Sequence, residues 1–212
     1  MRKGTIGMKI YKYDSYGEYV AEQTAGNKKK INHVFVKKQT MQKIKEMKAF
    51  AGSVLCHGTR NGAEQKFFKE VYGPQLKVVG SEISDTATQF PDTVEWDFMK
   101  PNPDWVGEFD IVYSNSFDHC FEPVETLRVW ADQLSPGGSL FIEHSFDPKN
   151  NKSRAMDPLE LSEEEFLQCV EDAGLKVVAK GQVSKMIPLF KIEKWFKQKL
   201  KQILSKSITS KL

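Results

Sequence analysis

Short apolar runs alternate with amphipathic stretches through the middle of the chain. The apolar runs have the length and residue content of buried strands. They cover 53–56, 76–80, 93–96, 109–113, 139–143 and 175–179. Apolar residues at helical spacing lie between them, over 63–71, 123–134 and 162–173. Strands that alternate with helices imply crossover connections, so the pattern predicts an α/β fold with a doubly wound, mostly parallel sheet and helices on both faces.

The segments on either side of this pattern are helical in character. Ser15 and Glu18 have the spacing of a capping box, so we expect a helix to begin there, with a second amphipathic helix around 41–48. Beyond the sheet, apolar residues recur at helical spacing among lysines over 192–204, which predicts a basic amphipathic helix. We therefore expect three parts: an N-terminal helical cap or lid (1–50), an α/β domain (51–190) and a basic C-terminal helix (191–212).

Composition favours a folded, soluble protein. Hydrophobic residues make up 40% and charged residues 28%, which is typical of a globular domain. No apolar run approaches the ~20 residues of a membrane span, and the first residues lack the apolar core of a secretory signal. The three cysteines predict no disulfide framework, and the four histidines lack ligand spacing, so we expect no metal. These features predict a cytoplasmic protein with reduced thiols.

Charge is unevenly distributed behind the formal net value of +3. Residues 1–50 hold 12 Lys or Arg against 4 Asp or Glu, and residues 185–212 hold 8 against 1. Residues 51–184 hold 11 against 23. Basic ends around an acidic centre predict either ends that pack against the centre or ends that meet an anionic partner.

Candidate chemistry lies directly after the predicted strands, where ligands bind in open α/β sheets. The first strand runs into a turn flanked by two glycines, which lets backbone N–H groups approach a ligand. Glu82 and Ile83 follow the second strand, 20 residues beyond Gly62, where an acid would accept hydrogen bonds from a ribose. Asp97 and Phe98 follow the third strand and suit an adenine ring. The fourth strand ends in small polar residues that leave room for a ligand, namely Ser114, Asn115 and Ser116.

These motifs, in this order, resemble those of class I S-adenosylmethionine-dependent methyltransferases, especially the small-molecule branch. The stretch 54–62 is similar to the family's glycine-rich first motif, Glu82 to its ribose-binding acid, and Asp97 with Phe98 to its adenine-binding pair. The stretches 109–123 and 134–140 resemble its fourth strand with the following loop and its Leu-x-Pro-Gly-Gly turn. The resemblance covers 52–145 well and 160–190 loosely.

The resemblance implies a Rossmann-like, seven-stranded sheet whose last strand is antiparallel, with the final pair near 175–180 and 183–190. It also implies S-adenosylmethionine as cofactor and methyl transfer to a small acceptor through oxygen, nitrogen or sulfur. The implied cofactor-binding residues are His57, Gly58, Thr59, Arg60, Asn61, Gly62, Glu82, Ile83, Asp97, Phe98, Ser114, Asn115 and Ser116.

Two residues depart from the family's first motif. Cys56 stands where the family usually has Asp or Glu, and Arg60 stands at its middle glycine. Arg60 either reaches the cofactor's carboxylate through a charge-assisted contact or obstructs the site. If Arg60 obstructs the site, the protein is expected to be a non-catalytic adaptor that keeps only the fold.

Proton removal from the acceptor requires a base at a strand end. His119 follows the fourth strand and is the first candidate, and Glu143 and His144 at the end of the fifth strand are alternatives. His57 lies inside the glycine turn, where support of the turn or cofactor contact is expected. His33 reaches the site only if the N-terminal segment folds over it.

The remaining alternatives concern the acceptor and the basic ends. Aromatic and polar residues through Gln23 and Asn27 precede Lys28–Lys30, which predicts either a simple packed cap or a lid whose lysines attract an anionic small molecule. An RNA or protein methyltransferase is the rival enzyme, but the loop after the fourth strand lacks the Asn/Asp-Pro-Pro-Tyr type of motif, which disfavours it. The C-terminal helix predicts packing or dimer contact first, peripheral membrane association second, and nucleic acid last.

Overall fold

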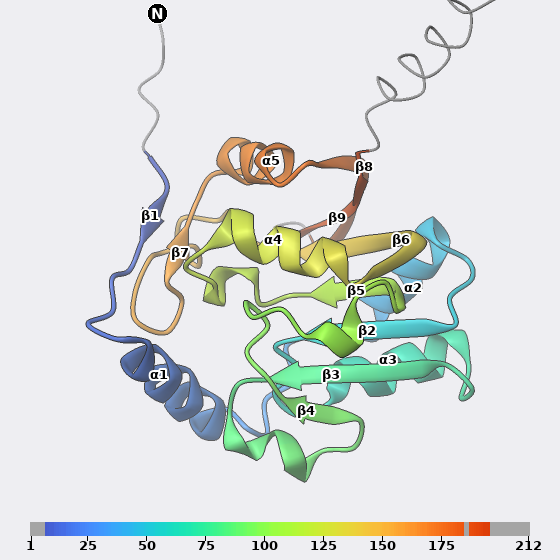
Figure 1. Ribbon diagram of the computed structural model, residues 1–212, viewed down its shortest axis with the longest axis horizontal. Helices are drawn as coiled ribbons and strands as arrows, with labels where there is room; N and C mark the ends of the chain where they lie inside the picture. Colours follow the sequence, from blue (N-terminus) through green and yellow to red (C-terminus); the bar gives the residue numbers. More distant parts are fainter. Residues whose placement is uncertain (1–6, 185–186, 196–212) are drawn as a thin grey trace, which may run out of the picture.

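A computed structural model describes residues 7–184 and 187–195 (Figure 1). The strands are β1 (Lys9–Ile10), β2 (Ser53–His57), β3 (Lys77–Glu82), β4 (Thr93–Glu95), β5 (Phe109–Ser114), β6 (Leu134–Glu143), β7 (Leu159–Glu160), β8 (Leu175–Ser184) and β9 (Ile187–Lys194). The α-helices are α1 (Tyr16–Lys29), α2 (Lys38–Met47), α3 (Ala63–Tyr72), α4 (Pro123–Asp132) and α5 (Glu163–Asp172). Three short 3₁₀ turns cover Asp85–Gln89, Pro103–Trp105 and Phe117–His119.

Seven strands form one sheet in the order β4-β3-β2-β5-β6-β9-β8. All neighbouring pairs are parallel except those that involve β9, which is antiparallel to both β6 and β8. The predicted Rossmann-like α/β sheet with an antiparallel last strand is confirmed. β2 lies beside both β3 and β5, so the strand order reverses next to it, and this is where ligands bind in such sheets.

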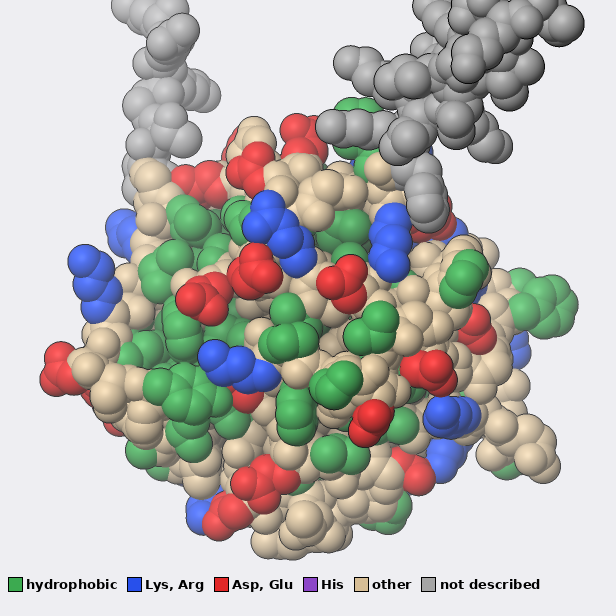
Figure 2. Space-filling model, in the orientation of Figure 1, with side chains coloured by type: hydrophobic (Ala, Val, Ile, Leu, Met, Phe, Trp, Pro, Cys, Tyr) green, Lys and Arg blue, Asp and Glu red, His purple; other side chains and the backbone are tan. Residues whose placement is uncertain are grey.

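Both faces of the sheet are buried, because alternate residues of each strand point to opposite sides. Leu55 packs with α4 and α5 in a cluster that contains Trp130 and Phe166. Cys56 points to the other face, where Met41 of α2 and other residues of α2 and α3 cover the sheet. Figure 1 shows α4 and α5 in front of the sheet and α2 and α3 behind it. Acidic, basic and hydrophobic side chains are interspersed across the front face in Figure 2.

The two helices of the N-terminal segment lie in different parts of the fold. α2 packs on α3 and β8, as part of the layer behind the sheet. α1 lies across the carboxyl ends of the parallel strands, toward which the arrowheads point in Figure 1. It begins at the predicted capping residue Ser15, whose hydroxyl accepts a hydrogen bond from the Glu18 N–H. A small antiparallel sheet of β1 and β7 lies beside it.

The C-terminal end differs from the helical pattern expected there. β9 continues to Lys194, so residues 191–194 extend the last strand. Phe190 and Ile192 are fully buried against the sheet, and that burial outweighs the helical spacing of the apolar residues. The rest of the predicted basic helix, from 196 onward, lies outside the described residues. None of the helices described is long and apolar enough to cross a membrane. Cys56, Cys120 and Cys169 are buried and unpaired.

Leu55→Ala should destabilise the fold because it leaves a cavity where a fully buried side chain meets α4 and α5. We expect the free energy of unfolding to fall by about 2–5 kcal/mol, measured by urea titration. Val178→Ala, at a position on β8 that is 39% exposed, is the control and should change it far less. Equal effects of the two substitutions would contradict this assignment of the core.

Candidate functional site

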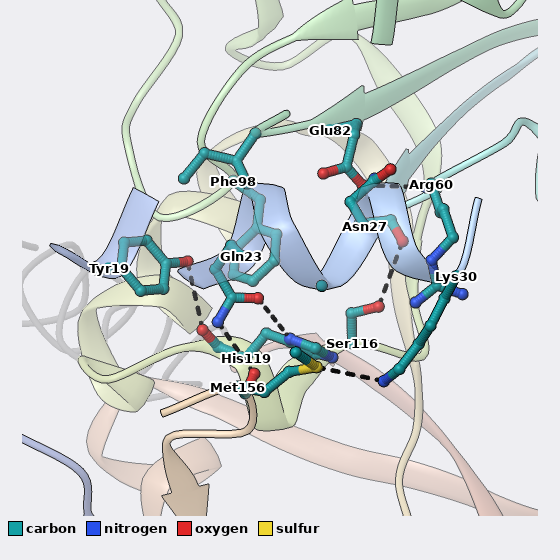
Figure 3. Close-up of a pocket in the computed structure, with 13 residues that line it drawn as sticks. Tyr19, Gln23, Asn27, Lys30, Arg60, Glu82, Phe98, Ser116, His119 and Met156 are labelled. Atoms are coloured by element: carbon teal, nitrogen blue, oxygen red, sulfur yellow. Dashed lines mark hydrogen bonds between the residues drawn. The ribbon is translucent and has the colours of Figure 1, made fainter. Parts of the chain in front are cut away.

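Two adjoining cavities open at the carboxyl ends of β2, β3 and β5, beneath α1. The narrow cavity has a volume of about 40 Å³ and the wide cavity about 370 Å³. They adjoin each other, because both are lined by Lys30, Gly58, Arg60, Ser116 and His119. Figure 3 shows Gln23 of α1 hydrogen-bonded to His119, and Asn27 of the same helix near Glu82 and Arg60, along the narrow cavity. The reversal of strand order beside β2 therefore coincides with a hollow that several elements line.

The glycine turn after β2 requires unusual backbone conformations. Gly58 and Gly62 have φ of 71° and 74°, in the left-handed region that favours glycine. A Cβ on Gly58 would also lie 2.7 Å from Ser116, so the turn and the end of β5 approach closely only because this residue is glycine. Arg60 has φ of 43° as well, a conformation that costs a residue with a side chain of the order of 1 kcal/mol. The position thus keeps the backbone shape of a glycine while carrying a long cation.

Glu82 is held at the end of β3 with its carboxylate against the glycine turn. One carboxylate oxygen accepts a hydrogen bond from the Arg60 N–H at 3.1 Å, and the other accepts from the Ser84 N–H at 3.1 Å. The residue is 7% exposed and lines the narrow cavity together with Ile83 and Phe98. A carboxylate held in a fixed orientation and two apolar side chains therefore form one wall of the narrow cavity.

Asp97 lies beside this wall but its carboxylate is engaged elsewhere. It accepts hydrogen bonds from the Tyr16 hydroxyl at 2.8 Å and from the Met99 N–H at 2.9 Å. Asp97 lines neither cavity, whereas its neighbour Phe98 does. In this conformation α1 occupies the acceptor atoms that the sequence pattern assigned to an adenine ring.

The other residues of the predicted binding set divide between the cavity walls and the interior. Thr59, Asn61 and Asn115 line the wide cavity. Gly62 lies outside both cavities, at the start of α3. Ser114 is buried, and its hydroxyl donates to the His57 carbonyl at 3.2 Å.

His57 is a structural residue within the core. Its ring nitrogens lie 2.7 Å from the Ser81 hydroxyl and 2.8 Å from the Gln133 side-chain oxygen. The ring stacks on Trp130 with a centroid separation of 5.0 Å. Burial lowers the pKa of His57 from 6.5 to about 4, so the imidazole is neutral inside the protein.

His119 is the base candidate that reaches the cavities, and it lines both of them. Its Nδ1 lies 2.7 Å from the Gln23 side-chain oxygen. The Gln23 amide nitrogen donates to the Met156 carbonyl, so its oxygen must accept the proton of His119 Nδ1. This tautomer leaves Nε2 free to accept a proton, with a carboxylate oxygen of Asp157 at 3.7 Å. The arrangement thus gives His119 the free ring nitrogen that a base requires.

Glu143 ends β6 and His144 follows it, but neither residue lines a cavity described above. The Glu143 carboxylate accepts hydrogen bonds from the Thr40 and Tyr113 hydroxyls, both at 3.0 Å, on the face covered by α2. His144 is 4% exposed and packs against aromatic rings, including Phe166. Burial raises the pKa of Glu143 and lowers that of His144, which keeps both side chains nearer their neutral forms.

The fold brings together one group with potential metal ligands that sequence spacing did not indicate. One side-chain atom from each of Asp118, His119 and Asp157 lies within 4.8 Å of the others. Arg154 donates from Nε to Asp157 at 2.6 Å, so one of these ligands already has a cationic partner.

Gln23, Asn27 and Lys30 belong to the stretch that the sequence predicted to form a packed cap or a lid, and they line the narrow cavity together with Tyr19. Other lining residues were missed by sequence reasoning. Glu64 in the first turn of α3 also lines the wide cavity, two residues after the glycine turn. Met156 comes from a loop that only the tertiary fold brings here.

Comparison with known proteins identifies the fold. No family model and no curated protein sequence matches the chain. Among solved structures, it is similar to 1,6-didemethyltoxoflavin-N1-methyltransferase from Burkholderia thailandensis, with bound 1,6-didemethyltoxoflavin and S-adenosylhomocysteine. That similarity has TM-score 0.65 and 14% identity, over 89% of this chain and 92% of that one. A putative methyltransferase in complex with the Haloferax volcanii activator Trm112 gives TM-score 0.65 and 17% identity, over 84% and 96%.

A third structure, the mitomycin 7-O-methyltransferase MmcR, gives TM-score 0.56 and 15% identity over 74% of this chain. The present chain spans 54% of its length. Similarity at these identities establishes the architecture and leaves activity to be argued from the site. The chain has the fold of class I S-adenosylmethionine-dependent methyltransferases.

The buried, neutral His57 should make stability depend on pH. The folded pKa of His57 is about 4 and lies below the unfolded value of 6.5. The stability that comes from burying neutral His57 is therefore fully present above pH 6.5 and is lost as pH falls toward 4. We expect the free energy of unfolding to fall by about 3 kcal/mol over this range. Urea unfolding of wild type and His57→Gln at pH 7.5, 5.5 and 4.5 measures this fall, because the variant lacks the titrating imidazole. The same dependence of unfolding free energy on pH in both proteins would refute the prediction.

Proposed function

We propose that the protein is an S-adenosylmethionine-dependent methyltransferase that acts on a small molecule through an oxygen, nitrogen or sulfur atom. The observation that carries the proposal is the convergence of Glu82, the glycine turn and His119 on adjoining cavities at the strand-order reversal. An acid for a ribose, a backbone cradle and a free base nitrogen thus share one site. The same fold in a methyltransferase with bound S-adenosylhomocysteine supports it.

The residues present fit the cofactor at three points. Glu82 is pre-oriented by two backbone N–H groups and suits both hydroxyls of a ribose. Ile83 and Phe98 offer apolar surfaces for the adenine ring. Buried polar atoms without a hydrogen-bond partner among the described residues, including Asn27 Nδ2 and Arg60 Nε, lie around the same cavities. Such atoms are costly when buried alone, which supports a polar ligand as their partner.

Arg60 leaves the glycine turn accessible, which supports catalysis over the adaptor alternative. Its guanidinium lies 4.8 Å from the centre of the Phe35 ring, at the rim of the wide cavity. Gly58 still lines both cavities beneath it. Asp97 belongs to the proposed adenine contact only after Tyr16 releases it, so we infer that α1 shifts when the cofactor enters.

When bound, S-adenosylmethionine supplies a methyl group already activated by its sulfonium. The protein must then position the acceptor and exclude water, and such positioning contributes roughly 7–11 kcal/mol in favourable cases. His119 Nε2 removes the acceptor proton, Gln23 holds the ring, and Asp157 stabilises the imidazolium. α1 and the segment that carries Met156 act as the lid, with the Met156 side chain packed against Gly26.

An anionic small molecule is the acceptor that the wide cavity favours. Lys30 and Lys149 line it, and neither has a carboxylate partner among the residues that the structure describes. Their free charge would attract a carboxylate or phosphate. The lid across the strand ends favours a small acceptor over RNA or protein, and the buried, unpaired thiols favour a cytoplasmic setting.

Glu82→Ala should weaken the binding of S-adenosylhomocysteine by about 1–3 kcal/mol, because hydrogen bonds to a charged group are lost. Isothermal titration calorimetry measures the change. Glu95→Ala is the matched control, since Glu95 pairs with Glu82 in the neighbouring strand but is exposed. Unchanged affinity in Glu82→Ala would remove this carboxylate from the site and with it the main support for the proposal.

His119→Ala should lower turnover by about 10²–10⁴-fold, the usual contribution of a general base, with S-adenosylhomocysteine affinity nearly intact. The readout is methyl transfer from labelled S-adenosylmethionine to candidate anionic acceptors, with affinity measured in parallel. His144→Phe tests the rival base within its aromatic cluster and should retain turnover. Equal losses of affinity and turnover in His119→Ala would make His119 a binding residue.

A further inference from the structure

Glu64 is a buried acid that the fold leaves incompletely partnered. It lies in the first turn of α3, is 6% exposed and lines the wide cavity. Its Oε2 is buried and has no hydrogen-bond partner among the described residues, and the same holds for Nε of Arg60. An unpaired carboxylate oxygen inside a protein is strongly unfavourable. A ligand that donates a proton or carries positive charge would relieve this cost.

The surroundings of Glu64 contain one cation and several acidic or neutral groups. Arg60 on the glycine turn is the nearby cation, and Glu82 at the end of β3 is a nearby anion. Cys56 of β2 and Tyr113 of β5 are also close to it, and the Asn115 side chain is a hydrogen-bond partner. Burial raises the pKa of Glu64 to about 8, so much of it is protonated at neutral pH when no ligand is bound.

Glu64 lies near the position at which the glycine-rich motif of the resembling family has an acid that this chain lacks. Cys56 stands at the position where the resembling family carries Asp or Glu. Burial raises the pKa of the Cys56 thiol, and the nearby Glu64 carboxyl adds to that rise. The acid therefore comes from the helix that follows the turn instead of from the strand that precedes it. Arg60, four residues earlier, adds a cation at a left-handed position where glycine would be less strained.

We propose that Glu64 and Arg60 together bind the amino-acid end of the cofactor, Glu64 taking the ammonium group and Arg60 the carboxylate group. The inference rests on the proposed function, since it specifies how that cofactor is bound. A zwitterionic end needs one partner of each sign, and here both partners have an unsatisfied polar atom beside the same cavities. Charge-assisted hydrogen bonds of this kind are among the strongest that proteins form.

Binding should be coupled to the ionisation of Glu64. The ammonium group favours the carboxylate form, so Glu64 releases a proton when the ligand binds near neutral pH. Affinity for a ligand with the ammonium group should therefore rise as pH increases from 6 toward 8. A ligand without the amino-acid end should show no such coupling through Glu64.

Calorimetry on Glu64→Gln with two ligands tests the inference. S-adenosylhomocysteine carries the amino-acid end, whereas 5′-methylthioadenosine shares the adenosine and the thioether sulfur but lacks it. We expect affinity for S-adenosylhomocysteine to fall by about 10- to 100-fold and affinity for 5′-methylthioadenosine to remain unchanged. The dependence of affinity on pH between 6 and 8 should also be weaker than in wild type.

Two further variants complete the test. Glu70→Gln, on an exposed part of the same helix where Glu70 pairs with Lys38, should alter neither affinity. Arg60→Met should weaken S-adenosylhomocysteine selectively, and it carries the test alone if Glu64→Gln does not fold. Selective loss in the site variants supports the inference.

The opposing results are distinct from one another. Wild-type affinity in both site variants, or equal loss for both ligands, overturns the inference while leaving the cofactor in place. Failure of wild type to bind either ligand overturns the proposed function itself, and the inference with it.

Discussion

The reversal of strand order beside β2 is the constraint on which the rest of the molecule depends. Because β3 and β5 flank β2, the connections that leave these strands diverge toward opposite faces of the sheet. The turn after β2 and the loop after β5 then border a hollow instead of packing together. Gly58 permits the close approach of these two corners, since any side chain there would collide with Ser116. The reversal of strand order and the absence of a side chain at Gly58 together explain why the cavities lie at this position.

The hollow is completed by a helix whose buried face is polar. Along α1, Gln23, Gly26 and Asn27 are buried, whereas an ordinary covering helix would bury aliphatic residues. Gln23 is hydrogen-bonded to His119, and the Asn27 side-chain oxygen accepts from the Thr86 hydroxyl, whereas Asn27 Nδ2 has no partner among the described residues. A polar interface of this kind is weaker than an apolar one and admits a polar ligand. The helix thus belongs to the site as well as to the fold.

Charge within the site is redistributed relative to the resembling family's pattern. The strand position that usually carries an acid holds Cys56, which packs as an apolar residue on the face of α2 and α3. Glu64 and Arg60 place opposite charges four residues apart across the start of α3. Placed on a turn and the following helix, they can meet a ligand from one side without a charge buried at the centre of the sheet, where desolvation would be most costly.

The sequence by itself determined the sheet, its helices and the strand ends at which the cavities open, because hydrophobic periodicity and turn residues act locally. Glu82, the glycine turn and His119 could be chosen this way, since Glu82 ends a strand and the other two lie in the connections that follow strands. Tertiary structure decided which residues near the strand ends face the cavities. Asp97 is hydrogen-bonded to Tyr16 instead, and Glu143 and His144 are packed within the layers that cover the sheet. It also brought Gln23, Glu64 and Met156 to the site, and it extended β9 through residues expected to be helical. Side-chain direction at a strand end depends on partners distant in the chain, and no local pattern contains them.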